Sequence, residues 1–365
     1  MDPLDILTNL HHIRPYFQAI VSADEQTVIG YEVVGRMETK TEVTSLGSFF
    51  RDHTVPDEYR LEVDETIQQQ ALRYLLERNE SSSLLFLNCD AGILMNDRGE
   101  RFLRLLDQHE KDGLSLQQIV IEMKEHDYKG DIVQLNHLLT YFRTLGIRIA
   151  VDDVGKGASN LDRIGFLSPD ILKVDLSYLI MENDLQSYSN VLYSLSMLAR
   201  KIGAILLYDG IEDEHHLHYA WRNGGNYYQG NLFGKPAKDF IEKERYKEFL
   251  KNEFHQFIVH EKRKLEARYQ FAMKLNDQLT SLLKQMKPTA TFDELLLLLS
   301  KEMNDVAFRM YVCDQYGFQK SSNIVKNEDG VWELQEHYKD KNWSWRPYFL
   351  ENITRMNYRQ TGLLS

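Results

Sequence analysis

Short apolar runs alternate with amphipathic stretches over the first two-thirds of the chain. The apolar runs end at Glu32, Asn88, Glu122, Asp152, Asp175, Asp209 and Gly230. Helical patterns separate most of them, at about 58–78, 101–111, 131–145, 187–201 and 212–221. Strand and helix repeated in this way form a parallel sheet. About seven or eight such units in roughly 240 residues favour a closed α/β barrel of the (β/α)8 TIM type. An open doubly wound sheet is the alternative, but no GxGxxG motif opens a helix.

The first strands of this region have a different pattern. Residues 16–36, YFQAIVSADEQTVIGYEVVGR, contain two strand patterns separated by a polar turn at 22–26. Two strands joined by a short polar turn form an antiparallel hairpin. We therefore expect an irregular barrel whose first strand is antiparallel.

A long helical pattern follows Pro236. Residues 238–287 contain neither proline nor glycine, and Glu261 and Arg268 interrupt an otherwise regular spacing of apolar residues. The apolar series is Ile258, Leu265, Ala272, Leu275, Leu279, Leu282 and Met286. This pattern predicts a long helix with an imperfect heptad face. The face either packs along the barrel or serves as a connector or dimer seam, and the sequence leaves both open.

Pro288 ends this helix, and a small α+β module follows. Its patterns are a helix at 292–304, the strand AFRMYVCD, a turn at 315–317, the segment WELQEHY and the segment NWSWRPYFLENI. The module ends without a final strand pair, as a truncated domain would. We predict a barrel domain at 1–240, a connector helix at 241–287 and a PAS- or Cache-like domain at 288–365.

Aromatic residues near the end of the module have two interpretations. Trp343, Trp345 and Phe349 form part of its core, or they line a pocket with Arg346 for a small ligand. We favour the core interpretation.

Composition excludes several functional classes. Hydrophobic residues make up 43% of the chain and charged residues 27%, as in ordinary globular proteins. The net charge of −12 argues against binding a DNA or RNA backbone, which requires a basic surface. Cys89 and Cys313 lack metal-ligand spacing, as expected of reduced thiols in the cytoplasm. We expect no signal peptide and no membrane span, because neither a basic leader nor a long apolar run is present.

Polar residues close the predicted strands. Glu32, Asn88, Glu122, Asp152, Asp175 and Asp209 each follow an apolar run, and Gln229 does so in the seventh. In a (β/α)8 barrel these ends meet at one rim, where active sites form. Polar residues also end strands as turn-formers or helix N-caps, but glutamate suits neither role.

The composition of this set favours hard divalent cations. Carboxylate and amide oxygens, without a cysteine or histidine cluster, suit Mg²⁺ or Mn²⁺. Two such ions about 3.5–4 Å apart catalyse phosphoryl displacement. The adjacent carboxylates of Asp152 and Asp153 are tolerable if they bridge two ions.

Two cationic side chains belong near this rim. Lys173 precedes Asp175 by two residues, so alternation places both on one face of the strand. A buried lysine requires a partner or a function, unless the strand lies at an exposed edge. Arg36 follows Glu32 by four residues, just past the predicted strand, where it either grips a phosphate or is solvated in a loop.

The region from about Tyr16 to Pro236 resembles the EAL domain, a family of bacterial cyclic di-GMP phosphodiesterases. Seven of the family's motifs have counterparts in the right order. They are EVVGR at 32–36, LLFLNCD at 84–90, EMKE at 122–125, DDVGKGASNL at 152–161, LKVD at 172–175, DGIE at 209–212 and QGNLFGKP at 229–236.

The resemblance implies a site and a reaction. Metal ligands would be Glu32, Asn88, Glu122 and Asp152 for one Mg²⁺ or Mn²⁺, and Asp152, Asp153 and Asp209 for a second. Ca²⁺ would bind and inhibit. Lys173 would position the attacking water, and Glu125 would anchor the loop that starts at Asp152. The dinucleotide would contact Gln18, Arg36, Glu212 and Gln229. The reaction would convert cyclic di-GMP to linear 5′-pGpG. The protein would be a cytoplasmic homodimer.

Several positions depart from the family pattern. Asp209 replaces a glutamate and is one methylene shorter, and about 1 Å of misplacement can cost ~10²-fold in rate. Val34 replaces a leucine, and Lys124 replaces a threonine. The loop carries Val154, Lys156 and Ala158 in place of Phe, Thr and an aromatic residue. We therefore retain two hypotheses, a phosphodiesterase and a cyclic di-GMP receptor with little turnover that signals through its C-terminal module.

Overall fold

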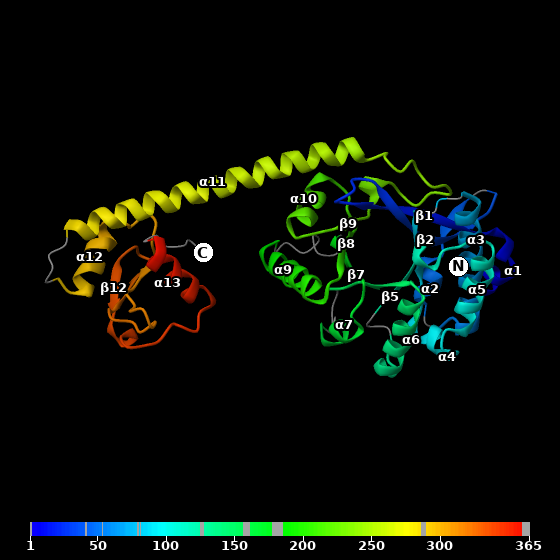
Figure 1. Cartoon of the computed structure of the whole chain (residues 1–365), viewed down its shortest axis with the longest axis horizontal. Coiled ribbons are helices and arrows are strands. Elements are labelled where there is room, and N and C mark those ends of the chain that lie inside the picture. Colours follow the sequence, from blue (N-terminus) through cyan, green and yellow to red (C-terminus); the bar gives the residue numbers. More distant parts are fainter. Residues whose placement is uncertain are drawn as a thin grey trace. The chain divides into compact units, whose positions relative to one another are not determined.

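The structure is a computed structural model of the chain (Figure 1). It describes residues 2–40, 42–52, 54–78, 80, 82–124, 128–155, 161–176, 185–285 and 290–359, with side chains omitted at 185–189 and 355–359. Contacts divide the chain into two compact units, Met1–Phe257 and Ile258–Ser365. The three-part division expected from the sequence stays a prediction.

The strands of the first unit form a sheet that closes on itself. β1 (Ile13–Ser22) pairs antiparallel with both β2 (Val28–Glu38) and β9 (Tyr227–Tyr228). The remaining barrel strands pair parallel with one another, in chain order from β2 to β9. Between β2 and β9 lie β4 (Leu84–Asn88), β5 (Ile119–Lys124), β6 (Arg148–Asp152), β7 (Ile171–Asp175) and β8 (Ile205–Asp209). The irregular (β/α)8 barrel with an antiparallel first strand is thus confirmed.

Helices cover the outside of the barrel (Figure 1). They are α3 (Asp57–Arg78), α4 (Ala91–Asn96), α5 (Glu100–Lys111), α6 (Ile132–Thr144), α7 (Leu161–Leu167), α9 (Leu185–Ile202) and α10 (Glu214–Arg222). Two shorter helices, α1 (Pro3–Thr8) and α2 (Gly47–Arg51), and the strand β3 (Val43–Ser45) precede α3. Leu85 and Leu87 of β4 belong to the large core shared with the helices, as expected of a strand that is buried on both faces.

The inside of the barrel holds a separate apolar cluster. Its members are Ile20, Ile29, Leu84, Phe86, Val120, Ala150, Ile171 and Leu207. Because side chains alternate along a strand, the residue two positions nearer the rim also faces inward. This rule places Asn88, Glu122, Asp152, Lys173 and Asp209 directly above the apolar cluster. The apolar runs and the polar residues that follow them are thus two levels of one barrel interior.

β2 is longer than its sequence pattern predicted. It pairs with β1 from Ile13↔Met37 to Val21↔Val28, so it continues six residues past Glu32, as far as Glu38. Glu32 therefore lies inside a strand rather than at its end, and the expectation that Arg36 follows the strand is wrong. The hairpin partner supplies hydrogen bonds that sustain the strand after its apolar run has ended.

The long helix α11 (Lys247–Gln285) starts later than the expected residue 241. The preceding segment is bound to the barrel instead, with Val28 N donating to Lys243 O at 2.9 Å and Ile241 N donating to Tyr31 Oη at 3.1 Å. Leu250, Phe254 and Phe257 of α11 are buried against the barrel core. Ile258 and Leu265, in the second unit, are 54% and 52% exposed.

The second unit has the α+β composition expected from the sequence. It contains α12 (Phe292–Glu302), α13 (Pro347–Arg359) and an antiparallel sheet of β10 (Arg309–Met310), β11 (Asn323–Lys326) and β12 (Trp332–Gln335). Leu296, Leu299, Met303 and Ile324 form its core with Leu275, Leu279 and Leu282 of α11. The PAS or Cache likeness stays a prediction.

One expectation about this core is wrong. Trp345 is 70% exposed, because it lies in the turn before α13, whereas Trp343 and Phe349 are half-buried. Among the helices in the described ranges, none is long and apolar enough to cross a membrane.

Candidate functional site

Polar side chains from eight barrel strands gather at the rim. They are Gln18 on β1, Glu32 on β2, Asn88 on β4, Glu122 on β5, Asp152 on β6, Lys173 on β7, Asp209 on β8 and Gln229 directly after β9. Hydrogen bonds and ion pairs connect most of them, although they lie far apart in the sequence. The barrel closure therefore brings together the residues that the sequence singled out.

Lys173 lies at the centre of this cluster. Its Nζ is 2.5 Å from Glu32 Oε2, 2.8 Å from Glu122 Oε1 and 4.0 Å from Asp209 Oδ2. Burial alone would lower the pKa of Lys173, but the charges of Glu122 and Glu32 raise this pKa well above its usual value. β7 lies between β6 and β8, and Lys173 is 2% exposed, so the edge-strand alternative is wrong.

Glu32 is fixed by three donors. Asn88 Nδ2 donates to its Oε1 at 3.0 Å, while Gln229 Nε2 and Lys173 Nζ donate to its Oε2 at 2.6 Å and 2.5 Å. Burial would raise the pKa of Glu32, but the charge of Lys173 and the hydrogen bonds from Lys173, Asn88 and Gln229 together outweigh burial and lower this pKa. Because Asn88 uses its amide nitrogen here, its amide oxygen remains available to a cation.

Glu122 is the most buried carboxylate of the cluster. It is 1% exposed, and its Oε2 has no hydrogen-bond partner among the described residues. Burial and the negative charge of Glu32 raise the pKa of Glu122 well above its usual range. A buried carboxylate oxygen without a donor is costly unless a cation binds it. The donor set therefore fits a hard divalent ion.

The rim carboxylates do not form a preassembled metal cage. In the parts of the chain that the structure describes, no three His, Cys, Asp or Glu side chains form a ready metal cage. Glu32 and Glu122 converge on the Lys173 ammonium instead. A cation bound by Glu122 Oε2 would therefore lie beside this ammonium.

Asp152 and Asp153 occupy different environments. Asp152 is half-buried at the end of β6, where burial raises its pKa against the opposing effect of Lys173. Asp153 is 8% exposed and adopts a left-handed backbone with φ of 57°. Its Oδ2 lies 2.5 Å from Nζ of Lys124, the last residue of β5. No local pattern indicates this ion pair, although Lys124 follows Glu122 by two residues and so shares its inward face.

Asp209 lies at the margin of the cluster. Its Oδ1 accepts a 2.6 Å hydrogen bond from Gly210 N, and its Oδ2 remains 4.0 Å from Lys173 Nζ. Burial raises the pKa of Asp209 to about 6, although Lys173 opposes this shift. Asp209 therefore changes its protonation close to neutral pH.

The rim geometry agrees with the comparisons with known proteins. Residues 5–236 match the family model described as the EAL domain, and residues 240–365 match the one described as an EAL-domain associated signalling protein domain. The chain belongs to the EAL-domain family. This assignment accounts for the order of the motifs along the barrel strands.

Individual relatives extend this family assignment. The EAL-domain containing protein YkuI of Bacillus subtilis is 51% identical over the whole of this chain and 90% of its own length. A crystal structure of YkuI in complex with cyclic di-GMP and calcium matches 99% of this chain and 90% of that chain with a TM-score of 0.92. The probable cyclic di-GMP phosphodiesterase PdeB of Escherichia coli is 25% identical over 62% of this chain and 43% of its own length. BlrP1 of Klebsiella pneumoniae, in a manganese and cyclic di-GMP complex, shares the fold with a TM-score of 0.54 and 24% sequence identity. The match covers 62% of this chain and 56% of the BlrP1 chain.

The remaining site residues implied by the EAL motifs differ in how deeply they are buried. Arg36 is half-buried within β2, where Nη1 donates to Ser45 Oγ at 3.2 Å and the guanidinium lies 5.9 Å from the ring of Tyr16. The loop alternative for Arg36 is therefore wrong. Glu212 is exposed outside the cluster and accepts a 2.8 Å hydrogen bond from Asn231 Nδ2. Glu125 lies outside the described residues, as do the loop positions 156 and 158.

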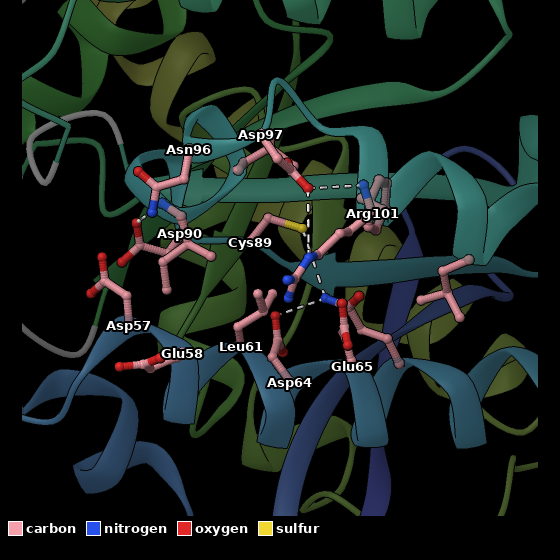
Figure 2. A pocket seen from close by; sticks show the side chains of 15 residues that line it. Asp57, Glu58, Leu61, Asp64, Glu65, Cys89, Asp90, Asn96, Asp97 and Arg101 are labelled. Atoms are coloured by element: carbon pink, nitrogen blue, oxygen red, sulfur yellow. Dashed lines mark hydrogen bonds and ion pairs between the residues drawn. The ribbon is translucent and has the colours of Figure 1, made fainter.

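A separate cavity of about 610 Å³ is lined by α3, by the segment that follows β4, and by α4 and α5. Figure 2 shows acidic side chains of α3 facing residues of α4 and α5 across it. Gln68 connects it to the rim, because its Nε2 donates to Asp64 Oδ2 at 2.8 Å and to Asn88 O at 3.3 Å. Burial, with the neighbouring charges of Glu65 and Asp90, raises the pKa of Asp64 to about 8. Asp64 therefore titrates in the physiological range, one hydrogen-bonded residue away from the rim.

Proposed function

We propose that this protein is a metal-dependent phosphodiesterase that hydrolyses cyclic di-GMP to linear 5′-pGpG. The observation that carries the proposal is the rim cluster around Glu122, a buried carboxylate with an oxygen that lacks a donor, in a chain of the EAL-domain family. The likeness to YkuI over the whole chain supports the same substrate, because the YkuI crystal structure contains cyclic di-GMP.

Four rim residues would hold the metal ion. Their oxygen donors, from Glu32, Asn88, Glu122 and Asp152, suit Mg²⁺ or Mn²⁺, and Ca²⁺ would bind there without supporting turnover. When bound, the ion supplies positive charge beside the phosphate and lowers the pKa of water. Lys173 keeps the carboxylates of Glu32 and Glu122 in register for this role.

The chemical step is the displacement of one phosphate ester by water. The water oxygen attacks phosphorus, the bond from phosphorus to the 3′ oxygen breaks, and a proton reaches that leaving oxygen. Asp209, with its pKa of about 6, would accept a proton from the attacking water near neutral pH. Lys173 would orient this water, since its Nζ is 2.8 Å from Glu122 Oε1 and 4.0 Å from Asp209 Oδ2.

Four further residues would hold the dinucleotide. Gln18 and Gln229 lie side by side, with Gln229 Nε2 3.3 Å from Gln18 Oε1, and would contact the part of the ligand above the barrel axis. Arg36 would contact a phosphate. Glu212, which is exposed beyond the cluster, would contact the outer part of the ligand.

A second function is favoured by two specific observations. Asp209 remains 4.0 Å from Lys173, and Lys124 forms an ion pair with Asp153. Both features would slow hydrolysis more than binding. The alternative is therefore a cyclic di-GMP receptor that turns over its ligand slowly and signals through the C-terminal unit.

One experiment separates these functions. The full chain is incubated with cyclic di-GMP and Mg²⁺, Mn²⁺ or Ca²⁺, and binding is measured by calorimetry while linear product is measured by chromatography. Product with Mg²⁺ or Mn²⁺, and binding without product with Ca²⁺, is the expected result. Binding without product in all three ions would establish the receptor, and no binding would contradict both functions. Glu122→Gln, which keeps the shape of the side chain, should lose more than about 10²-fold in metal affinity.

We also propose the setting in which the protein acts. The free thiols of Cys89 and Cys313 support a cytoplasmic location. We propose that it acts as a homodimer, that domains divide at 240 and 287, and that the C-terminal domain senses a small ligand. Sedimentation of the full chain with and without cyclic di-GMP would test the dimer.

A further inference from the structure

Lys124 lies on the inner face of the barrel, one level above the metal-ligand candidates. Val120 belongs to the apolar cluster inside the barrel, and Glu122 faces the rim cluster, so alternation along β5 directs Lys124 to the same side. The register of the parallel pair β5 and β6 places Lys124 directly beside Asp152. The backbone of Lys124, a cationic residue, is therefore adjacent to that of a candidate metal ligand.

The Lys124 ammonium is bound to one of these carboxylates. Its Nζ lies 2.5 Å from Oδ2 of Asp153, which is 8% exposed. The backbone around Asp153 is held in place, because its φ is 57° and the next amide, Val154 N, donates to Lys173 O at 3.1 Å. The Asp153 carboxylate is therefore engaged by a cation of this chain and is carried by a backbone that is hydrogen-bonded to β7.

An ammonium and a divalent ion compete for the same carboxylate. Mg²⁺ binds carboxylate oxygens at about 2.0–2.1 Å and demands nearly ideal octahedral geometry. A metal ion at Asp153 would have to displace the Lys124 ammonium from Oδ2, the oxygen that it occupies. Glu122 differs in this respect, since its Oε2 has no donor among the described residues.

We propose that this protein binds one divalent cation per chain, at Glu32, Asn88, Glu122 and Asp152, and that the Lys124 ammonium takes the place of a second ion at Asp153. The two-ion site implied by the EAL motifs thus does not fit this chain. This inference rests on the proposed function for the first ion. Lys124 acts here as a positioning residue, because it determines how many ions surround the substrate phosphate.

This arrangement has a direct consequence for turnover. An ammonium neutralises Asp153 but, unlike a metal ion, offers no open coordination position to water. The chain then retains affinity for a cyclic dinucleotide and loses part of its hydrolytic rate. The dinucleotide would therefore stay bound for longer, and any signal to the C-terminal unit would last as long as the ligand is bound.

The test counts metal ions in the absence of dinucleotide. The full-length wild type and Lys124→Thr are titrated with Mn²⁺ by calorimetry and examined by electron paramagnetic resonance, which distinguishes an isolated Mn²⁺ from an exchange-coupled pair. We expect one isolated ion for the wild type and a coupled pair for Lys124→Thr. The rate of cyclic di-GMP hydrolysis should rise at least about tenfold in the variant, in line with the gain of a second activating ion.

Two control variants keep the outcome interpretable. Lys124→Arg preserves the positive charge and should retain one ion, and Lys111→Thr, at an exposed position at the end of α5, should behave as the wild type. A coupled pair in the wild type would overturn the proposal, and so would a single ion in a folded Lys124→Thr. If neither protein binds cyclic di-GMP while the ion counts differ as expected, the proposed function fails and the role of Lys124 stands.

Discussion

Lys173 and Glu122 are joined by a 2.8 Å hydrogen bond between Nζ and Oε1, although they lie on strands separated by β6. This bond leaves Oε2 of Glu122 without a donor among the described residues. One oxygen of the carboxylate is therefore anchored to the barrel and the other is presented to a ligand. The same lysine also fixes Glu32, so a single ammonium organises two candidate metal ligands.

Replacing Lys173 with methionine should strongly destabilise the barrel. The substitution keeps the length of the side chain but leaves the buried carboxylates of Glu32 and Glu122 without their shared cation. Breaking a buried pair in this way costs on the order of 3–5 kcal/mol in the free energy of unfolding. Urea denaturation followed by circular dichroism measures the loss, and added Mn²⁺ should restore part of it. A change below about 1 kcal/mol would show that the pair does not stabilise the fold.

Lengthening Asp209 to glutamate should increase hydrolysis. Asp209 Oδ2 lies 4.0 Å from Lys173 Nζ, and one additional methylene would bring the carboxylate closer to the cluster. A correction of about 1 Å in position can be worth up to ~10²-fold in rate. Initial rates of 5′-pGpG formation at saturating Mn²⁺ would show the increase, with Asp209→Asn as the control that should lose activity. If Asp209→Glu is no faster than the wild type, the limit lies in the region of Lys124 and Asp153.

Gly230 should not tolerate a side chain. Its φ is +148°, and an added Cβ would lie 2.2 Å from Ile211 O and 2.3 Å from Ile211 N. Gly230→Ala should therefore cost about 1–3 kcal/mol in stability through overpacking, with backbone strain in addition. It should also displace Gln229 and weaken dinucleotide binding.

A second glycine provides the matched control for this change. Gly165 in α7 has no heavy atom within 4 Å of an added Cβ. Gly165→Ala should be neutral or should stabilise the helix by about 0.5–1 kcal/mol. Thermal unfolding and calorimetric binding of cyclic di-GMP measure both variants. Equal behaviour of the two would contradict the importance of the tight turn after Gln229.

The stability of the barrel should depend on pH through Asp64. Its pKa of about 8 in the folded chain exceeds the usual value of 3.8. Between these two pH values the folded chain retains a proton that the unfolded chain releases, so stability falls as the pH rises and the penalty is complete above about pH 8. Asp64→Asn removes this ionisation and should be more stable than the wild type at pH 9, by on the order of 1–3 kcal/mol, with no difference near pH 4. Unfolding at several pH values tests this, with the exposed Asp107→Asn as control. A constant difference across the pH range would exclude Asp64 as its source.

Sequence patterns were sufficient for the barrel because they are local. Near-continuous apolar runs such as LLFLN and ILKVD bury both faces of a strand, and their polar ends meet at the same rim in any parallel barrel. The positions of Asn88, Lys173 and Asp209 followed directly from this rule. The start of α11 at Lys247 did not, because hydrogen bonds from Tyr31 and Val28 hold the preceding segment in a non-helical conformation.

The sequence by itself determined the fold, the order of its strands and the candidate ligands at the rim, since each depends on spacing within a segment. Tertiary structure alone decided how these side chains share their charges. It placed Lys173 between Glu32 and Glu122, extended β2 past Glu32 and paired Lys124 with Asp153. These contacts depend on strand register and barrel closure, which bring residues together from distant parts of the chain, and no local pattern encodes such distances.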